Sequence, residues 1–174
     1  DRYFYTESGS TDKKEGEEQN SVNKKEYEMT SHCLVLAWFI TLIVPLLEYL
    51  HLNRHNLYLS ILGIVFVVVG TIIRGVGLKT LGEVFSREVG SEENQRIIKT
   101  GVYRYVRHPA YAGNILQVIG FPLILNSYFS FILSLITVGI LVWRIKVEEE
   151  FLTSEFPEYK EYMKKTERII PGVW

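Results

Sequence analysis

The chain has 174 residues, of which 47% are hydrophobic, and its formal net charge at pH 7 is −1. This length is typical of a single domain. The weak net charge argues against a nucleic-acid partner, because binding a phosphate backbone requires a concentrated basic surface. The single cysteine, Cys33, excludes both a disulfide framework within this sequence and a cysteine-rich metal site.

Residues 1–30 form a polar leader with eight acidic and five basic side chains. Such a composition buries too little apolar surface to offset the entropy lost when a chain becomes ordered. We therefore expect a solvated cytoplasmic loop over residues 1–30, followed by a membrane domain over residues 31–174.

Three nearly uncharged stretches follow the leader, and they exclude a soluble globular protein. Residues 33–50 carry one charge, residues 57–73 carry none, and residues 110–143 run for 34 positions without one. A helix of that last length would measure about 51 Å, which is too long for one crossing of a hydrocarbon layer of about 30 Å. The stretch therefore predicts two short helices that turn back at Pro122, Asn126 and Ser127.

The predicted fold is all-α and integral to the membrane, with about four transmembrane helices arranged as two helical hairpins. We expect these helices at about 31–50, 56–78, 110–125 and 128–147, with a tight turn between the first two. Eighteen of the 19 basic residues lie outside the turn at 51–56, in segments that an even number of crossings brings to one side. The positive-inside rule makes that side cytoplasmic.

Two cytoplasmic segments complete the prediction. The loop between the second and third helices mixes aromatic and charged residues, which favours an ordered segment against the membrane surface. The tail over residues 148–174 continues the fourth helix until Pro157 breaks it, and a second short helix follows from about Pro157 to Lys165. This tail is either a surface helix that leans on its own domain or a lid over a site.

The sequence Arg107-His108-Pro109 lies immediately before the longest uncharged stretch. Proline is well suited to the first turn of a helix, so Pro109 marks the start of the third helix. The unpaired N–H groups at that start favour an anion. A helix start flanked by aromatic and arginine membrane anchors would give the same pattern.

Charged residues at the end of the fourth helix suggest a second feature. Arg144 and Glu148 are one turn apart, which places a guanidinium and a carboxylate on one helix face. The acidic run at 148–150 indicates either a solvated face or a site for a cationic ligand. Glu48 and Arg74 lie close enough to an interface to reach it with their side chains. No metal site is expected, because the four histidines share no ligand spacing.

The segments GVYRYVRHPAYAG at 101–113 and RIKVEEEFL at 144–152, with the aromatic tail that follows, resemble the isoprenylcysteine carboxyl methyltransferase family. The resemblance covers roughly residues 74–174. It implies a multi-pass enzyme of a cell inner membrane or the endoplasmic reticulum that binds S-adenosylmethionine at the cytoplasmic face. Its acceptor would be a lipid-like carboxylate, by family default a C-terminal prenylcysteine. Family members commonly carry a further helix before the leader, so we expect this sequence to begin after that helix.

The resemblance also implies the site residues. Arg144 falls where the family holds the substrate carboxylate, and we expect it to be catalytic. The positions at which the family holds its cofactor are occupied here by Glu88, Gln95, Arg96, Ile97, Ile98, Tyr103, His108, Pro109, Ala110, Tyr111 and Glu148.

The chemistry of the cofactor agrees with these positions. S-adenosylmethionine carries a carboxylate, an ammonium, a sulfonium and an adenine ring, so its site needs an anion-binding group, an acid and flat apolar contacts. The start of the third helix, Glu148, and Tyr103 or Tyr111 would supply them. Two alternatives stay open at this point: a phospholipid amine N-methyltransferase, and a non-catalytic membrane scaffold or lipid carrier.

Overall fold

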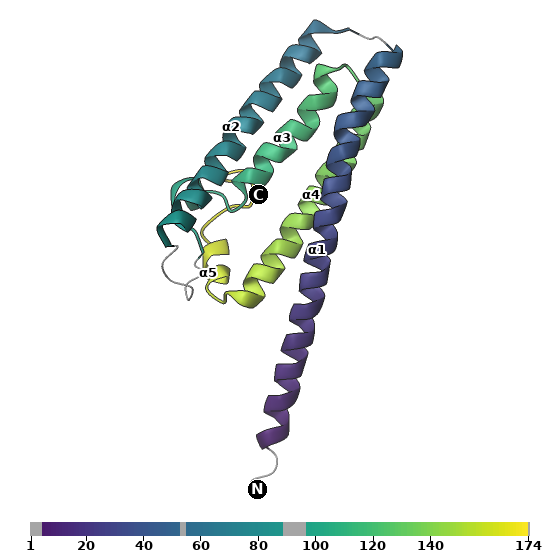
Figure 1. Cartoon of the computed structure of the whole chain (residues 1–174). Coiled ribbons are helices and arrows are strands. Elements are labelled where there is room, and N and C mark those ends of the chain that lie inside the picture. The colour runs from purple at the N-terminus through teal and green to yellow at the C-terminus, as the bar shows by residue number, and fades with distance from the viewer. Residues whose placement is uncertain (1–4, 53–54, 89–96, 174) are drawn as a thin grey trace.

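The computed structural model describes residues 5–52, 55–88 and 97–173, with side chains from residue 25 onward except those of residues 83–88. Its elements, shown in Figure 1, are α1 (Tyr5–Leu52), α2 (Leu57–Glu88), the 3-10 helix η1 (Gly101–Arg104), α3 (Pro109–Ile124), α4 (Tyr128–Glu155) and α5 (Tyr159–Met163). Within these ranges the only β pairing is an isolated parallel bridge between Val106 and Glu167. The predicted all-α fold is confirmed.

Three of the helices are long and apolar enough to cross a membrane. They are Lys25–Leu52 within α1, Leu57–Gly82 within α2, and α4, while α3 is a shorter apolar helix. Large apolar side chains are exposed along α1 and α2, among them Leu50 and Ile72. An exposed apolar surface of this extent suits contact with lipid rather than water. The chain is therefore a multi-pass membrane protein.

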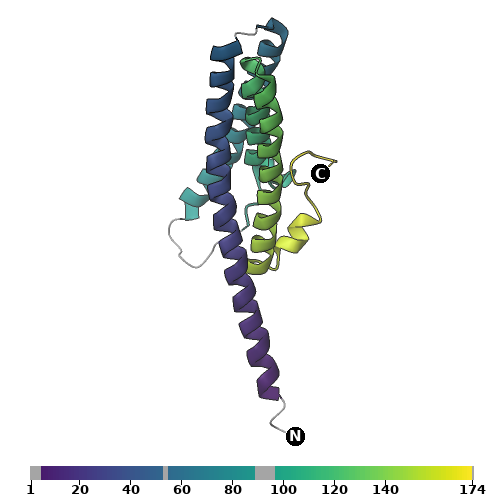
Figure 2. The ribbon, with the colours of Figure 1, turned by 90° about the vertical axis from the view of Figure 1, so that its right-hand side faces the viewer.

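The leader differs from the loop that we expected. Residues 5–30 continue α1 as an unbroken helix, which projects beyond the ends of the other helices (Figure 2). Once the apolar part of α1 is helical, each further residue adds a hydrogen bond without the cost of a new nucleus. The leader is also rich in Glu and Lys, which are good helix formers. For the same reason α2 and α4 extend beyond their predicted ends at 78 and 147.

The helices pair across the two predicted hairpins. α2 packs along α3, and α1 packs along α4. α1 and α2, between which we expected a tight hairpin, are joined at one end and diverge from there (Figure 1). The turn between α3 and α4 lies at two of the three predicted residues, with Asn126 at a φ of 54° and Ser127 as the N-cap of α4. Pro122, the third, lies inside α3 instead.

Glycines bring the backbones of α2 and α3 into contact. A Cβ placed on Gly70 would lie 2.6 Å from the carbonyl oxygen of Gly113, and one placed on Gly63 would lie 2.7 Å from that of Gly120. Gly63 and Gly70 are seven residues apart, so they lie on the same face of α2. Small residues at such positions allow membrane helices to approach closely. This stripe holds α3 in place beside α2.

Two ionisable side chains that we expected to reach an interface join helices to one another. The Glu48 carboxylate of α1 accepts hydrogen bonds from the backbone N–H of Phe129 at 3.1 Å and of Ser130 at 3.0 Å. A carboxylate there satisfies unpaired N–H groups at the start of α4 and complements the helix dipole. The Arg74 guanidinium of α2 donates to the Asn114 side chain of α3.

The glycine stripe gives a first prediction. Changing Gly113 to Ala should lower the free energy of unfolding by about 1–3 kcal/mol, because the new methyl group meets the backbone of α2. The matched control is Gly75→Ala, since a Cβ at Gly75 has no neighbour within 4 Å. Thermal unfolding of the detergent-solubilised protein measures the difference, and equal midpoints for the two variants would contradict the packing.

Candidate functional site

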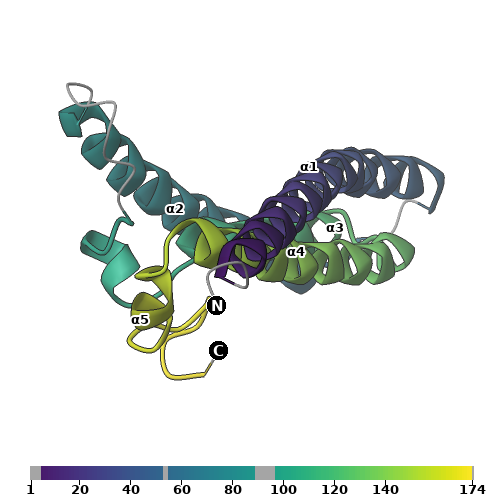
Figure 3. The same cartoon turned by 90° about the horizontal axis from the view of Figure 1, so that it is seen from below.

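The candidate site lies at the end of the bundle where α2 and α4 end and α3 begins. The view from below in Figure 3 shows α5 and the C-terminal tail grouped at this end, to one side of α1. Backbone hydrogen bonds attach the tail to the start of α3. The N–H of Arg107 donates to the carbonyl of Glu167 at 2.8 Å, and the N–H of His108 donates to that of Arg168 at 2.9 Å. The tail and the start of α3 therefore form one unit.

The start of α3 is the one predicted. His108 is its N-cap, and Pro109 occupies the first turn. The N–H groups of Ala110 and Tyr111 come next, and groups at these positions have no carbonyl partner within their own helix. The His108 and Tyr111 rings lie 5.7 Å apart between centroids. This end of α3 thus combines an aromatic surface with backbone donors.

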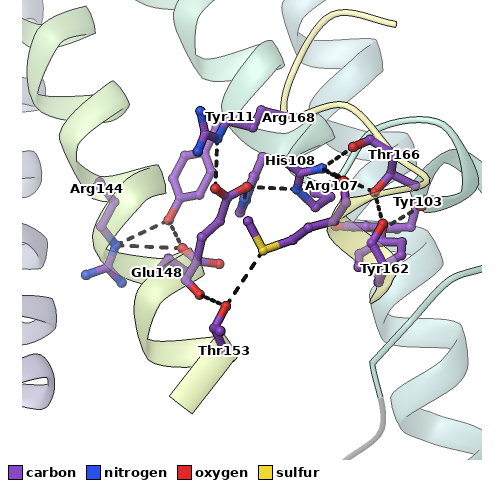
Figure 4. A network of polar contacts seen from close by, with 12 residues as sticks. Tyr103, Arg107, His108, Tyr111, Arg144, Glu148, Thr153, Tyr162, Thr166 and Arg168 are labelled. Carbon is purple, nitrogen blue, oxygen red and sulfur yellow. Dashed lines mark hydrogen bonds and ion pairs between the residues drawn. The ribbon is translucent and has the colours of Figure 1, made fainter. Parts of the chain in front are cut away.

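The Arg144 cluster consists of Arg144 and Glu148 of α4 and Tyr111 of α3 (Figure 4). The Tyr111 hydroxyl donates to Glu148 Oε2 at 2.6 Å, and Arg144 Nε donates to the same hydroxyl at 3.3 Å. Arg144 Nε lies 3.8 Å from Glu148 Oε2. The Arg144 side chain is 6% exposed and that of Glu148 is 23% exposed. The cluster is therefore partly open, and the opening is on the side of the carboxylate.

The Glu149 cluster lies beside it and consists of Glu149, Arg107, His108 and Arg168; Figure 4 labels the last three of these. Glu149 Oε1 accepts from Arg107 Nε at 2.8 Å and lies 3.3 Å from His108 Nε2. Glu149 Oε2 accepts from Arg168 Nε at 2.7 Å. The Glu149 side chain is only 4% exposed, and such a buried carboxylate is stable only when it is fully paired. The third acid of the predicted run, Glu150, is exposed.

Further hydrogen bonds fix α5 and the tail in place. Arg107 Nη1 donates to the carbonyl of Met163 at 3.1 Å and to that of Thr166. The Tyr162 hydroxyl donates to the carbonyl of Tyr103 at 2.6 Å. Burial raises the pKa of Tyr162 to about 12 against the opposing effects of Arg107 and Thr166. The phenol therefore keeps its proton at neutral pH and continues to donate.

The structure brings together five of the residues expected to hold the cofactor and places four of them at the start of α3. These are His108, Pro109, Ala110 and Tyr111, with Glu148 facing them from α4. Arg144, expected to bind the acceptor, contacts the same group through Tyr111. Their joint role in binding stays a prediction.

The other residues expected to hold the cofactor lie away from the start of α3, or the structure does not describe their side chains. Tyr103 is buried in η1, and Ile97 and Ile98 are half-buried just before it. Glu88 is the last residue of α2, and its side chain is not described. Gln95 and Arg96 lie outside the described residues.

Of the residues that hold this site in place, the sequence drew attention to Arg107 and to the acidic run at 148–150, but it did not distinguish Glu149 from Glu148. Glu149 could have been identified from its register, because it falls about 100° around the helix from Glu148 and must face a different neighbour. Tyr27 and Thr30 of α1, which contact Arg144, lie in the segment that we expected to be a loop.

A cavity of about 570 Å³ lies between α4 and the tail, on the opposite side of α4 from Arg144. Its lining is Lys146, Glu149, Glu150, Thr153, Ser154, Lys160, Met163 and Arg168. None of these residues is among those expected to hold the cofactor. In the described part of the chain, no group of three or more His, Cys, Asp or Glu side chains could hold a metal ion.

The Glu149 cluster gives a second prediction. Changing Glu149 to Ala should release the tail, because Arg107 and Arg168 would lose the carboxylate between them, and breaking a buried pair costs about 3–5 kcal/mol. Limited trypsin digestion should then cut at Lys160, Lys164 or Lys165 much faster than in the wild type. The adjacent, exposed Glu150→Ala is the control and should digest like the wild type; equal rates for both variants would refute the role of Glu149.

Known proteins resemble this chain over most of its length. Residues 61–154 match the isoprenylcysteine carboxyl methyltransferase (ICMT) family. A probable protein-S-isoprenylcysteine O-methyltransferase of Oryza sativa subsp. indica is 32% identical over 124 residues, which cover 67% of this chain and 63% of that protein. Protein-S-isoprenylcysteine O-methyltransferase A of Arabidopsis thaliana is 29% identical over 160 residues, 83% of this chain and 79% of that protein.

A third relative is protein-S-isoprenylcysteine O-methyltransferase of Saccharomyces cerevisiae, 31% identical over 160 residues. The match covers 87% of this chain and 65% of the yeast protein, so the chain spans just under two thirds of the rice and yeast relatives. The family match includes the start of α3, Arg144 and the three glutamates at 148–150. Because that match extends over more than half of the sequence, the chain belongs to the isoprenylcysteine carboxyl methyltransferase family.

Proposed function

We propose that the protein transfers a methyl group from S-adenosylmethionine to the carboxylate of a lipid-like acceptor, with a C-terminal prenylcysteine as the first acceptor to test. The Arg144 cluster is the observation that carries this proposal. It places a guanidinium, a partly exposed carboxylate and a phenol together beside the start of a membrane helix. The family and the names of the relatives support the same reaction.

The chemistry of the residues present fits S-adenosylmethionine. Glu148 is partly exposed and could accept from the ammonium of the cofactor. The N–H groups of Ala110 and Tyr111 suit its carboxylate, and the Tyr111 and His108 rings offer flat surfaces to its adenine. When bound, the cofactor would supply an electrophilic methyl group on its sulfonium.

The residues of this chain would then bind and orient the acceptor. No general base is required, because a carboxylic acid with a pKa of about 4 is already ionised at neutral pH. The planar guanidinium of Arg144 suits a carboxylate through paired hydrogen bonds. Holding the reacting atoms in line and excluding water contributes up to roughly 7–11 kcal/mol in such reactions. Orientation is thus the main task of the site.

We place the site at the cytoplasmic face of the membrane. The segment that leads into α3, the end of α4 and the tail contain nine basic residues, whereas the connection at 51–56 contains only Arg54; the nine are Lys99, Arg104, Arg107, Arg144, Lys146, Lys160, Lys164, Lys165 and Arg168. Basic residues near the ends of membrane helices accumulate on the cytoplasmic side. An acceptor anchored in the bilayer by an apolar chain would reach the Arg144 cluster from the membrane.

The proposal predicts a base-labile product. The protein in lipid vesicles should transfer label from methyl-labelled S-adenosylmethionine to an S-farnesylcysteine with a free carboxylate, and mild base should release the label as methanol. An amine acceptor such as phosphatidylethanolamine would give a base-stable product instead. A base-stable product, or no product from protein that binds the cofactor, would overturn the proposed reaction.

The role of Arg144 is tested by Arg144→Lys, which keeps the charge and removes the fork of donors. The rate with the farnesylated acceptor should fall by roughly 10²-fold, as expected for misplaced reacting groups, while calorimetry still detects cofactor binding. Lys146→Met on the exposed face of α4 is the control and should retain the rate. Loss of cofactor binding in Arg144→Lys would show that Arg144 acts on the cofactor instead.

A further inference from the structure

The guanidinium of Arg144 is held from one side by the part of α1 that precedes its apolar segment. Arg144 Cζ lies 3.4 Å from the centroid of the Tyr27 ring. Arg144 Nη1 donates to Thr30 Oγ1 at 2.7 Å and to the backbone carbonyl of Tyr27. Thr30 is fully buried. One helical turn of α1 therefore supplies a ring face and two acceptors to a single arginine.

The Tyr27 ring is itself fixed by α4. It stacks on the ring of Phe151, with centroids 5.5 Å apart and planes inclined by 29°. Arg144 and Phe151 are seven residues apart, so they lie on the same face of α4. Tyr27 thus bridges two positions of one helix face, and its ring has little freedom to move away from the guanidinium.

These contacts leave one edge of Arg144 available. An arginine side chain has five N–H donors. In Arg144, the two of Nη1 donate to Tyr27 and Thr30 of α1, and that of Nε donates to the Tyr111 hydroxyl. The two N–H groups of Nη2 make no hydrogen bond to any residue that the structure describes. In that part of the chain, Asn126 Oδ1 is the only fully buried side-chain polar atom without a hydrogen-bond partner. Nη2 of Arg144 also lacks a partner but is not such an atom, so it is not fully buried.

We propose that Tyr27 is a positioning residue for the acceptor, whose stacked ring holds the Arg144 guanidinium so that Nη2 meets the acceptor carboxylate. This inference rests on the proposed function. A ring face stabilises a desolvated cation without adding a negative charge. A carboxylate in the place of Tyr27 would neutralise Arg144 and compete with the acceptor. The aromatic contact therefore orients the arginine without adding a second carboxylate to that of Glu148, which lies 3.8 Å from Arg144 Nε.

The test compares Tyr27→Leu with Tyr27→Phe in the full chain. The probes are N-acetyl-S-farnesylcysteine and its carboxamide, which share the apolar chain and differ in the carboxylate. Calorimetry without cofactor measures binding of each probe, and turnover measures the KM for the acid. Tyr27→Leu should weaken binding of the acid by roughly tenfold, as expected for loss of a desolvated cation–π contact, and should leave binding of the carboxamide and of S-adenosylmethionine unchanged.

Tyr27→Phe keeps the ring and should bind both probes like the wild type. Phe39→Leu is the matched control, because it removes an exposed ring from the same helix. Equal weakening of acid and carboxamide, loss of cofactor binding, or wild-type binding in Tyr27→Leu would each overturn the role of Tyr27. A wild-type protein that forms no base-labile ester would instead overturn the proposed function, so the two failures are distinguishable.

Discussion

The pairing of the buried Glu149 carboxylate is the interaction on which this end of the molecule depends. It accepts from Arg107 just before α3 and from Arg168 in the tail, and it belongs to α4. An ion at this depth is tolerated only while all of its partners remain in place. The same contacts therefore hold three separate parts of the chain at one point, and they bring Tyr111 of α3 within reach of Arg144 on α4.

Consecutive residues of α4 have different tasks because a helix turns by about 100° per residue. Glu149 is enclosed and has partners on both oxygens, which is the condition of a structural ion pair. Glu148 is partly exposed, and the hydroxyl of Tyr111 is the donor to one of its oxygens. The Glu149 cluster therefore stabilises the fold, whereas the Arg144 cluster, which contains Glu148, remains open to a ligand. The two glutamates are nevertheless adjacent in sequence.

Much of the fold could be predicted from the sequence, because long uncharged stretches, Pro109 and the turn at Asn126 act locally. The site could be predicted only through motif positions at the start of α3 and on α4. The remaining features depend on contacts between distant segments. The leader is helical because α1 propagates into it. The role of the glycines depends on the packing of α2 against α3, and the contact of Tyr27 with Arg144 depends on the pairing of α1 with α4. No local pattern in residues 25–30 indicates a role in the site.

The short length of α3 affects how a lipid-anchored substrate could reach the Arg144 cluster. Its 16 residues span about 24 Å, whereas the hydrocarbon layer is about 30 Å thick. If its Ile124 end reaches the far boundary of that layer, its His108 end stops several ångströms below the near headgroups, or the bilayer thins to meet it. A farnesyl chain could then stay immersed in lipid tails while its polar terminus meets Arg144, with no need to lift out of the membrane.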